Sequence, residues 1–182
     1  MKSIEEQLAR YKSVHLNQKN VKTHFIGVPL IVFAVTLLLS SIRFEIALPD
    51  LLNTSANHTL TLAMVIFAFV ALYYFILHRL LALGMLLYIS VNLYLASILS
   101  DTVGVLAIAI ALFVLGWIIQ FVGHYYEKAK PAFVDDLSQF LIGPLFLLAE
   151  VYFILGLEPV LNTRVTLLAV EKRKVIESEN RS

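Results

Sequence analysis

The chain has 182 residues, of which 59% are hydrophobic and 15% are charged, and its formal net charge is +1. This apolar content exceeds that of soluble domains and indicates an integral membrane protein. No basic patch is interleaved with aromatic residues, which excludes nucleic acid as a partner, and the lack of cysteine excludes disulfides and thiolate metal sites. We predict one all-α membrane domain, with an amphipathic helix and turn in 1–24, an apolar bundle in 25–157 and a basic cytoplasmic tail in 158–182.

The first residues are predicted to form a helix on the membrane surface. Ser3 and Glu6 match the S-x-x-E capping box at a helix start. Ile4, Leu8 and Tyr11 then follow at helical spacing, and His15 continues the same apolar face. We expect this face to pack on the bundle.

Four uncharged apolar stretches are long enough to cross a bilayer, namely 25–42, 59–77, 80–99 and 102–122. A fifth stretch, 137–157, has the length but contains Gly143, Pro144 and Glu150. We therefore predict a polytopic bundle of four spanning helices. The fifth segment is expected to be broken near Gly143-Pro144 and either re-entrant or buried against the bundle.

The distribution of lysine and arginine predicts the orientation of the chain. With four spans, every basic residue except Arg43 lies on one side, which the positive-inside rule makes the cytoplasm. Both termini are then cytoplasmic. The alternative is that 137–157 also spans, which would place the basic tail outside.

This topology gathers histidines at one membrane face. His24 precedes the first span, His124 follows the fourth, and His15 belongs to the surface helix of the same side. His15 and His24 are nine residues apart, so the chain must bend between them to bring both rings together. We expect the remaining two histidines, His58 and His78, to be structural.

Polar residues accompany His124 at helical spacing. Gln120, His124 and Glu127, with Trp117 before them, form one stripe on a continuing helix. An imidazole and a carboxylate three residues apart can bind one metal. Two histidines and a carboxylate leave open positions on Fe(II) for a substrate and O₂, and His15 would be a third ligand or an orienting group.

Each of these residues also has a structural interpretation. Interfacial histidines are often only hydrogen-bonded, and Glu127 with Lys128 and Lys130 could form a surface salt-bridge cluster. A carboxylate inside an apolar run, such as Glu150, is a functional candidate, but it could also cap a broken helix or pair with a basic residue. On this interpretation the protein is a small membrane transporter or an assembly factor.

Two stretches resemble a known family of membrane proteins. They are 15–30, HLNQKNVKTHFIGVPL, and 116–150, GWIIQFVGHYYEKAKPAFVDDLSQFLIGPLFLLAE. They are similar to the fungal-type 2-hydroxy fatty acid dioxygenases, which act in the α-oxidation step of phytosphingosine breakdown. The resemblance implies a membrane enzyme that uses Fe²⁺ and O₂ to shorten a 2-hydroxy fatty acid by one carbon.

The resemblance also marks individual residues. It implies His15, His24 and His124 as metal ligands, with Gln120 and Glu127 beside them. One departure is that two residues separate His124 from Glu127, where the fungal form has three, which argues against Glu127 as a direct ligand. We therefore expect the following roles: catalytic residues Glu127, Gln120 and Glu150, and substrate-binding residues Asn20 and Lys128.

Overall fold

The computed structural model describes residues 2–46, 58–134 and 136–179 of the chain. Its elements are, in order, α1 (Ile4–Ser13), α2 (Gln18–Ser40), β1 (Arg43–Ile46), β2 (His58–Thr61), α3 (Leu62–Leu77), α4 (Arg79–Leu99), α5 (Val105–Glu127), the short 3₁₀ helix η1 (Ala132–Val134), α6 (Gln139–Ile154) and α7 (Pro159–Glu179). The predicted all-α class is confirmed. The antiparallel β1–β2 ribbon, in which Arg43 pairs with Thr61, was not predicted.

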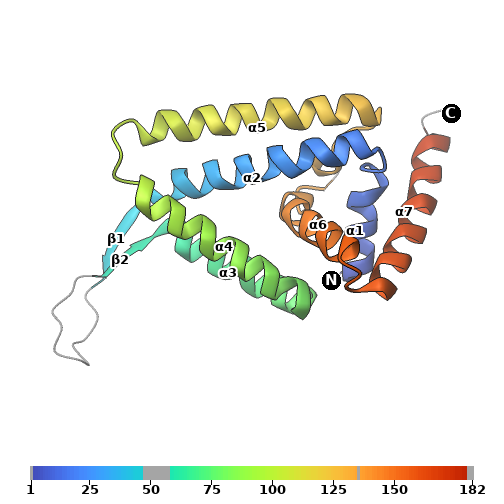
Figure 1. Ribbon diagram of the computed structural model, residues 1–182, viewed down its shortest axis with the longest axis horizontal. Coiled ribbons are helices and arrows are strands. Elements are labelled where there is room, and N and C mark those ends of the chain that lie inside the picture. The colour runs from blue at the N-terminus through green and yellow to red at the C-terminus, as the bar shows by residue number, and fades with distance from the viewer. Residues whose placement is uncertain (1, 47–57, 135, 180–182) are drawn as a thin grey trace.

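α2 and α5 run antiparallel and side by side along the long axis of the molecule (Figure 1). Glycines make this approach possible, because a Cβ atom on Gly27 would lie 2.9 Å from the carbonyl oxygen of Gly116. A Cβ atom on Gly123 would overlap the hydroxyl of Thr23. Small residues of this kind are the usual contact between membrane helices. Their effect here is to bring the beginning of α2 against the end of α5.

The helices begin and end at residues that the apolar runs do not reveal. α2 starts seven residues before the predicted span, because the side chain of Asn17 caps it by accepting from the Lys19 backbone N–H at 2.9 Å. α3 starts at Leu62 because Thr61 caps it in the same way. α5 continues to Glu127 and ends where Lys128 adopts a left-handed conformation with φ of 55°. His24 and His124 therefore both lie inside helices.

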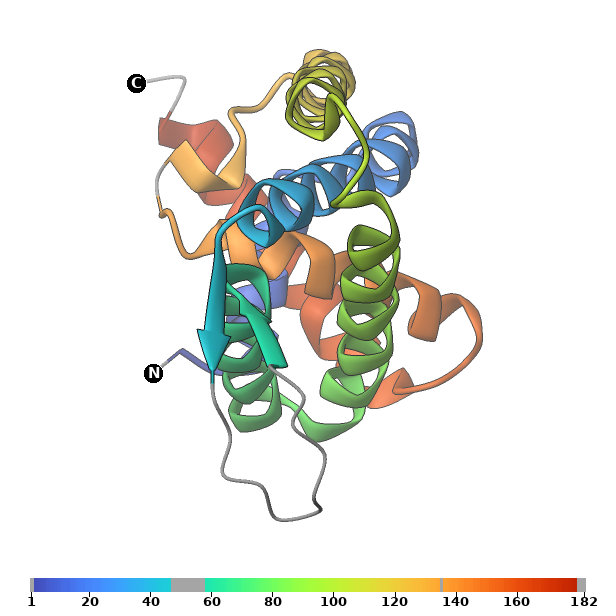
Figure 2. The ribbon, with the colours of Figure 1, turned by 90° about the vertical axis from the view of Figure 1, so that its left-hand side faces the viewer.

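Three helices, α2, α4 and α5, are long and apolar enough to cross a membrane. α3 and α6 are apolar but have 16 residues each, which corresponds to about 24 Å of helix against a hydrocarbon core of about 30 Å. The three long helices indicate a membrane protein, and the predicted number of four spans is not established. Figure 2 shows α3 and α4 side by side beneath the α2–α5 pair.

The predicted break in the fifth apolar segment is wrong. α6 is a continuous helix through Gly143 and Pro144. Proline removes one backbone hydrogen bond, but the helix is held by burial of Ile142, Leu145 and Phe146, all at most 1% exposed. The segment packs on α1, α2 and α4, and its place relative to the membrane stays a prediction.

The predicted basic tail is a helix that completes the fold. In α7, Leu161, Val165 and Ala169 recur every fourth residue and are buried. This stripe faces α1, where Leu8 and Ala9 are fully buried. The two helices lie together across the end of the bundle where α2 begins and α5 ends (Figure 1).

We expect both termini to be cytoplasmic, since α1 and α7 pack together and therefore share one side. Reporter fusions at the two ends would test this orientation. A fusion inserted in residues 47–57 is the matched control. The flanking strands β1 and β2 lie at the opposite end of the bundle from α1 and α7, so this fusion should report the other side. A periplasmic or luminal signal from the C-terminal fusion would contradict the prediction.

Candidate metal centre

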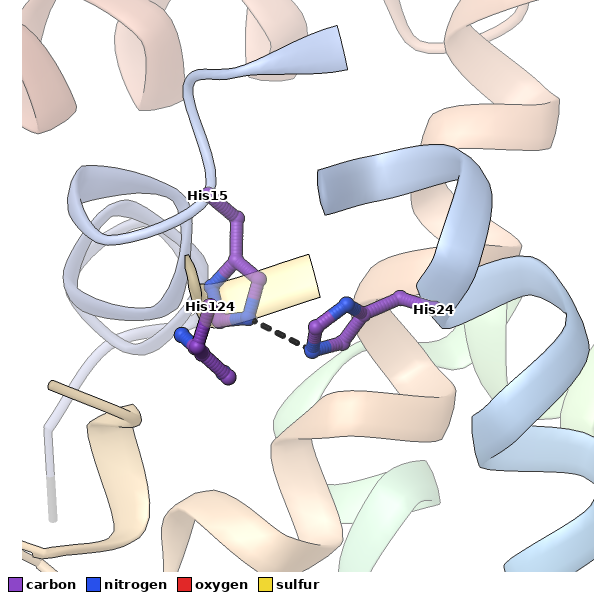
Figure 3. A group of neighbouring side chains, drawn as sticks. All are labelled: His15, His24 and His124. Carbon is purple, nitrogen blue, oxygen red and sulfur yellow. Dashed lines mark hydrogen bonds between the residues drawn. The ribbon is translucent and has the colours of Figure 1, made fainter. Parts of the chain in front are cut away.

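Three buried histidines from three different elements converge where α1, α2 and α5 meet (Figure 3). His15 lies in the turn after α1, His24 on α2 and His124 on α5. One ring nitrogen from each lies within 4.8 Å of the others. This is the set that topology and resemblance predicted, and its geometry could hold one metal ion.

His15 is placed by the reversal between the first two helices. α1 ends at Ser13 and α2 begins at Gln18, so the predicted bend is confirmed, although His15 lies beyond the helix rather than on it. Its ring stacks on Tyr11 with centroids 4.1 Å apart, and Phe146 of α6 lies 5.9 Å away. Packing against these two aromatic rings restricts the orientation of the imidazole.

Backbone carbonyls determine which nitrogens of His15 and His24 are free. His15 Nδ1 lies 2.6 Å from the Tyr11 oxygen, and His24 Nδ1 lies 2.9 Å from the Asn20 oxygen. Carbonyl oxygens only accept, so each Nδ1 carries hydrogen and each Nε2 presents a lone pair. Carbonyl contacts of this kind orient metal-binding histidines.

The two free Nε2 atoms then face each other at 2.9 Å, the contact drawn dashed in Figure 3. Three contacts each need one hydrogen: the two Nδ1 contacts with carbonyl oxygens and the contact between the two Nε2 atoms. Two neutral rings carry only two N–H hydrogens, so with any choice of tautomers at least one contact joins two lone pairs. A shared cation removes this conflict. If two imidazole nitrogens each lay roughly 2.0–2.1 Å from one metal ion, with a right angle between them at the metal, they would be about 2.9 Å apart. The pair therefore fits adjacent positions on one metal ion.

Burial keeps His15 in the form that binds metals. Loss of solvent, and then the neighbouring rings of His24 and His124, lower the pKa of His15 well below its usual value. A metal-binding imidazole must be deprotonated at one nitrogen, so a neutral ring needs no further proton release.

Unpaired polar atoms surround the histidines. Among the described residues, four side-chain atoms are buried without a hydrogen-bond partner: Asn20 Oδ1, Gln120 Nε2, His124 Nδ1 and Gln139 Oε1. Gln120, His124 and Gln139 line one cavity together with His15 and His24; its empty volume, including the part open to solvent, is about 510 Å³. Each unsatisfied buried group costs about 1–3 kcal/mol, so the gathering of these three around one cavity indicates a site for a polar ligand.

Gln139 is the residue of this cavity that sequence reasoning missed. It opens α6, and its Nε2 donates to Gln7 Oε1 of α1 at 3.0 Å, which leaves Oε1 as the unpaired atom. The one signal in the sequence is an uncharged polar residue at the start of an apolar run. That signal does not reveal its proximity to Gln7, which is 132 residues away.

Glu127 lies next to the histidine cluster, and donors surround both of its oxygens. One oxygen accepts from the backbone N–H of Leu16, and the other from the N–H of Asn17 at 2.8 Å and from Asn20. Arg173 of α7 forms an ion pair with it at 3.2 Å. The carboxylate thus joins the turn that carries His15 to the ends of α5 and α7, and it is not among the three clustered ligand atoms.

The two predicted substrate-binding residues lie outside the cavity lining. Asn20 is fully buried, and its amide donates to the Val14 carbonyl and to Glu127. Lys128 is exposed at the end of α5. Asn20 therefore supports the turn through these contacts, and the substrate-binding role of Asn20 and Lys128 stays a prediction.

Glu150 and His78 have partners away from the histidine cluster. Glu150 forms an ion pair with Lys12 at 2.6 Å, with side chains 18% and 15% exposed, as the alternative interpretation predicted. His78 caps α4, where its Nδ1 accepts from the Leu81 backbone N–H, and it lies 3.7 Å from Glu158. The structural role expected for His78 is confirmed, while the side chain of His58 lies outside the described residues.

Replacing Glu150 with leucine is expected to reduce thermal stability and activity more than the same change at Glu171, which is exposed on α7. The substitution leaves Lys12 partly buried without its partner, at a cost of about 2 kcal/mol, or roughly 4–8 °C in Tm. Thermal unfolding of both variants measures this difference. The double variant K12M/E150L should recover part of the loss, and equal Tm values for E150L and E171L would show that the pair is dispensable.

The sequence is similar to proteins of one known family. The family model described as 2-hydroxy-palmitic acid dioxygenase Mpo1-like matches residues 1–155. The 2-hydroxy-palmitic acid dioxygenase MPO1 of Saccharomyces cerevisiae is 32% identical over 159 residues, which cover 86% of this chain and 83% of the yeast protein. No solved structure matches the chain. The chain therefore belongs to the Mpo1-like family of 2-hydroxy-palmitic acid dioxygenases, as its two motif-bearing stretches predicted.

Proposed function

We propose that this protein is an Fe(II)-dependent dioxygenase that shortens 2-hydroxy fatty acids by one carbon. The observation that carries the proposal is the buried cluster of His15, His24 and His124, in which two free Nε2 atoms face each other at 2.9 Å. The activity in the name of the yeast relative supports the same substrate class. A transporter or assembly factor would leave both this cluster and the family relationship without explanation.

The donor set of the cluster suits Fe(II). Three imidazoles would leave further coordination positions open on Fe(II), as the two histidines and one carboxylate of the non-heme iron oxygenases do. An iron ion held there would supply a centre that binds the carboxylate and hydroxyl oxygens of the substrate and makes O₂ reactive. His15 and His24 are held for this role by their Nδ1–H contacts to the carbonyl groups.

The unpaired polar atoms of the cavity match the head group of a 2-hydroxy acid. Gln120 Nε2 is a donor, which suits the carboxylate, and Gln139 Oε1 is an acceptor, which suits the 2-hydroxyl group. Gln7 keeps Gln139 in this orientation. These contacts would align the C1–C2 bond of the substrate beside the histidines and satisfy two groups that otherwise remain buried and unpaired.

The proposed reaction balances with one O₂ for each 2-hydroxy acid. The C1–C2 bond breaks, C2 is oxidised to the carboxyl carbon of an acid one carbon shorter, and C1 leaves as CO₂. These changes release four electrons, which reduce O₂; one oxygen atom enters the new carboxyl group and the other leaves as water. The neutral histidines and glutamines take no net part in this balance and serve to bind and orient.

Metal removal is expected to abolish O₂-dependent loss of 2-hydroxypalmitic acid, and added Fe(II) should restore it where Zn(II) does not, because zinc cannot supply electrons. O₂ uptake and mass spectrometry of the C15 acid measure the reaction, and palmitic acid, which lacks the 2-hydroxyl group, is the matched control compound. Undiminished turnover by metal-free protein would overturn the proposal.

A further inference from the structure

A second, apolar chamber adjoins the histidine cavity inside the bundle. Its empty volume, with the part open to its surroundings, is about 930 Å³. Side chains from α2, α3, α4, α5 and α6 line it, and they are aliphatic or aromatic, with polar atoms only at two tyrosines and one tryptophan. The chamber and the cavity share five lining residues: Ile31, Val32, Trp117, Phe140 and Pro144.

Two helices carry a histidine at one end and chamber residues along the same face. On α2 the lining residues recur at steps of three and four, which places them on one side of the helix; they are His24, Val28, Ile31, Val35 and Leu39. On α5 the corresponding series runs in the opposite direction through His124, Gln120, Trp117 and Phe113. The polar cavity and the apolar chamber thus follow one another along the same faces of α2 and α5, and together they define a path from the histidines into the bundle.

The depth of this path matches a lipid chain. Val35 lies eleven residues from His24 and Leu39 fifteen, so they are about 16 and 22 Å further along α2. Half of a hydrocarbon core of about 30 Å is about 15 Å. Val35 therefore lies at the depth that the acyl chains of one leaflet reach when their head groups are level with the histidines.

We propose that this chamber holds the acyl chain of the substrate and that Val35 and Leu39 set the chain length it accepts. This inference rests on the proposed function in one respect: the acid is taken to bind with its carboxylate at the histidines and its chain in the chamber. Each methylene moved from water into an apolar site changes affinity about fourfold, so a chamber of fixed depth discriminates sharply between acids that differ by a few carbons.

The test compares binding and turnover of 2-hydroxypalmitic acid, with 16 carbons, and 2-hydroxylauric acid, with 12 carbons, by the purified full-length protein. In Val35→Phe the added ring should exclude several methylenes, so the ratio of affinities for the longer over the shorter acid should fall at least tenfold. Leu39→Trp, one turn deeper, should produce a smaller fall in the same direction. The matched control is Val114→Phe, at a similar depth on α5 but 50% exposed on its outer face.

Equilibrium binding of radiolabelled acids separates this proposal from the proposed activity. A changed binding ratio in the two chamber variants and not in Val114→Phe supports the chamber, even if no acid is oxidised. An unchanged ratio in soundly folded Val35→Phe and Leu39→Trp overturns it, even if the wild type oxidises both acids. Absence of fatty acid binding by the wild type would also overturn it.

Discussion

Replacing His24 or His124 with alanine is expected to abolish metal binding together with O₂-dependent turnover of 2-hydroxypalmitic acid. Each histidine supplies one of the three clustered ligand atoms, and among the described residues this group has no fourth member. Loss of a group that only orients a ligand already costs about 10–100-fold in metal affinity or activity, so loss of a ligand itself should cost at least as much.

Metal-dependent thermal stability gives a readout that is independent of activity. A metal at 100 times its Kd stabilises the native protein by about 2.7 kcal/mol, which corresponds to roughly 5–10 °C in a chain of this size. This increase in Tm should disappear in both alanine variants, and their metal-free Tm should stay close to that of the wild type, since each substitution removes one member of the crowded imidazole cluster.

His58→Ala is the control, because β2 lies at the end of the bundle opposite the cluster (Figure 1). It should keep both the iron and the stabilisation by iron. Iron content measured on the three purified variants decides the matter. A His124→Ala protein with a full complement of iron would remove the histidine cluster as the metal site.

Replacing Glu127 with leucine is expected to produce the largest loss of stability of any single substitution proposed here. Its side chain is 2% exposed and pairs with Arg173, while its oxygens accept from three further N–H groups. Removing one member of a buried ion pair costs about 3–5 kcal/mol, or roughly 6–20 °C in Tm. The turn that carries His15 should loosen in the same variant, so iron affinity should fall as well.

Two further variants separate positioning from direct chemistry at Glu127. Glu127→Gln keeps an oxygen that accepts from the turn but lacks the charge opposite Arg173, so it should lose stability and retain measurable turnover. The double variant E127L/R173M should be more stable than the sum of the single effects predicts, by 1 kcal/mol or more. Normal Tm with complete loss of turnover in Glu127→Gln would instead identify Glu127 as a catalytic residue.

Hydropathy alone predicted the apolar helices, but it could not predict where they begin. The cap Asn17 lies before its apolar run, and Thr61 lies inside the predicted stretch 59–77, so hydropathy marks neither as a helix start. Their side-chain hydrogen bonds to the backbone set where α2 and α3 begin. The continuous path of α6 through Pro144 was missed for a related reason. Local propensity predicts a break at that residue, whereas packing against three other helices keeps the helix intact.

The candidate site shows the same division between local and long-range information. Charge distribution placed His15, His24 and His124 at one membrane face, and the family motifs marked the same three residues. Helical spacing also placed Glu127 beside His124. It could not show that Leu16 and Arg173 donate hydrogen bonds to the carboxylate, since they are 111 and 46 residues away in the sequence. The sequence did not indicate Gln139 as a site residue, because its hydrogen bond with Gln7 depends on how α6 packs on α1.

The pairing of the first helix with the last also has a consequence in time. Arg173 donates to Glu127 and also to the carbonyl of Ser13, which lies 160 residues earlier in the sequence. A ribosome adds roughly 5–20 residues per second, so roughly 10–30 seconds separate the synthesis of Ser13 from that of Arg173. During that interval α1 lacks its partner helix. Glu127 is made only 46 residues before Arg173, so its carboxylate lacks the guanidinium for roughly 2–9 seconds. The turn that carries His15 therefore reaches its final set of contacts only after α7 has been synthesised.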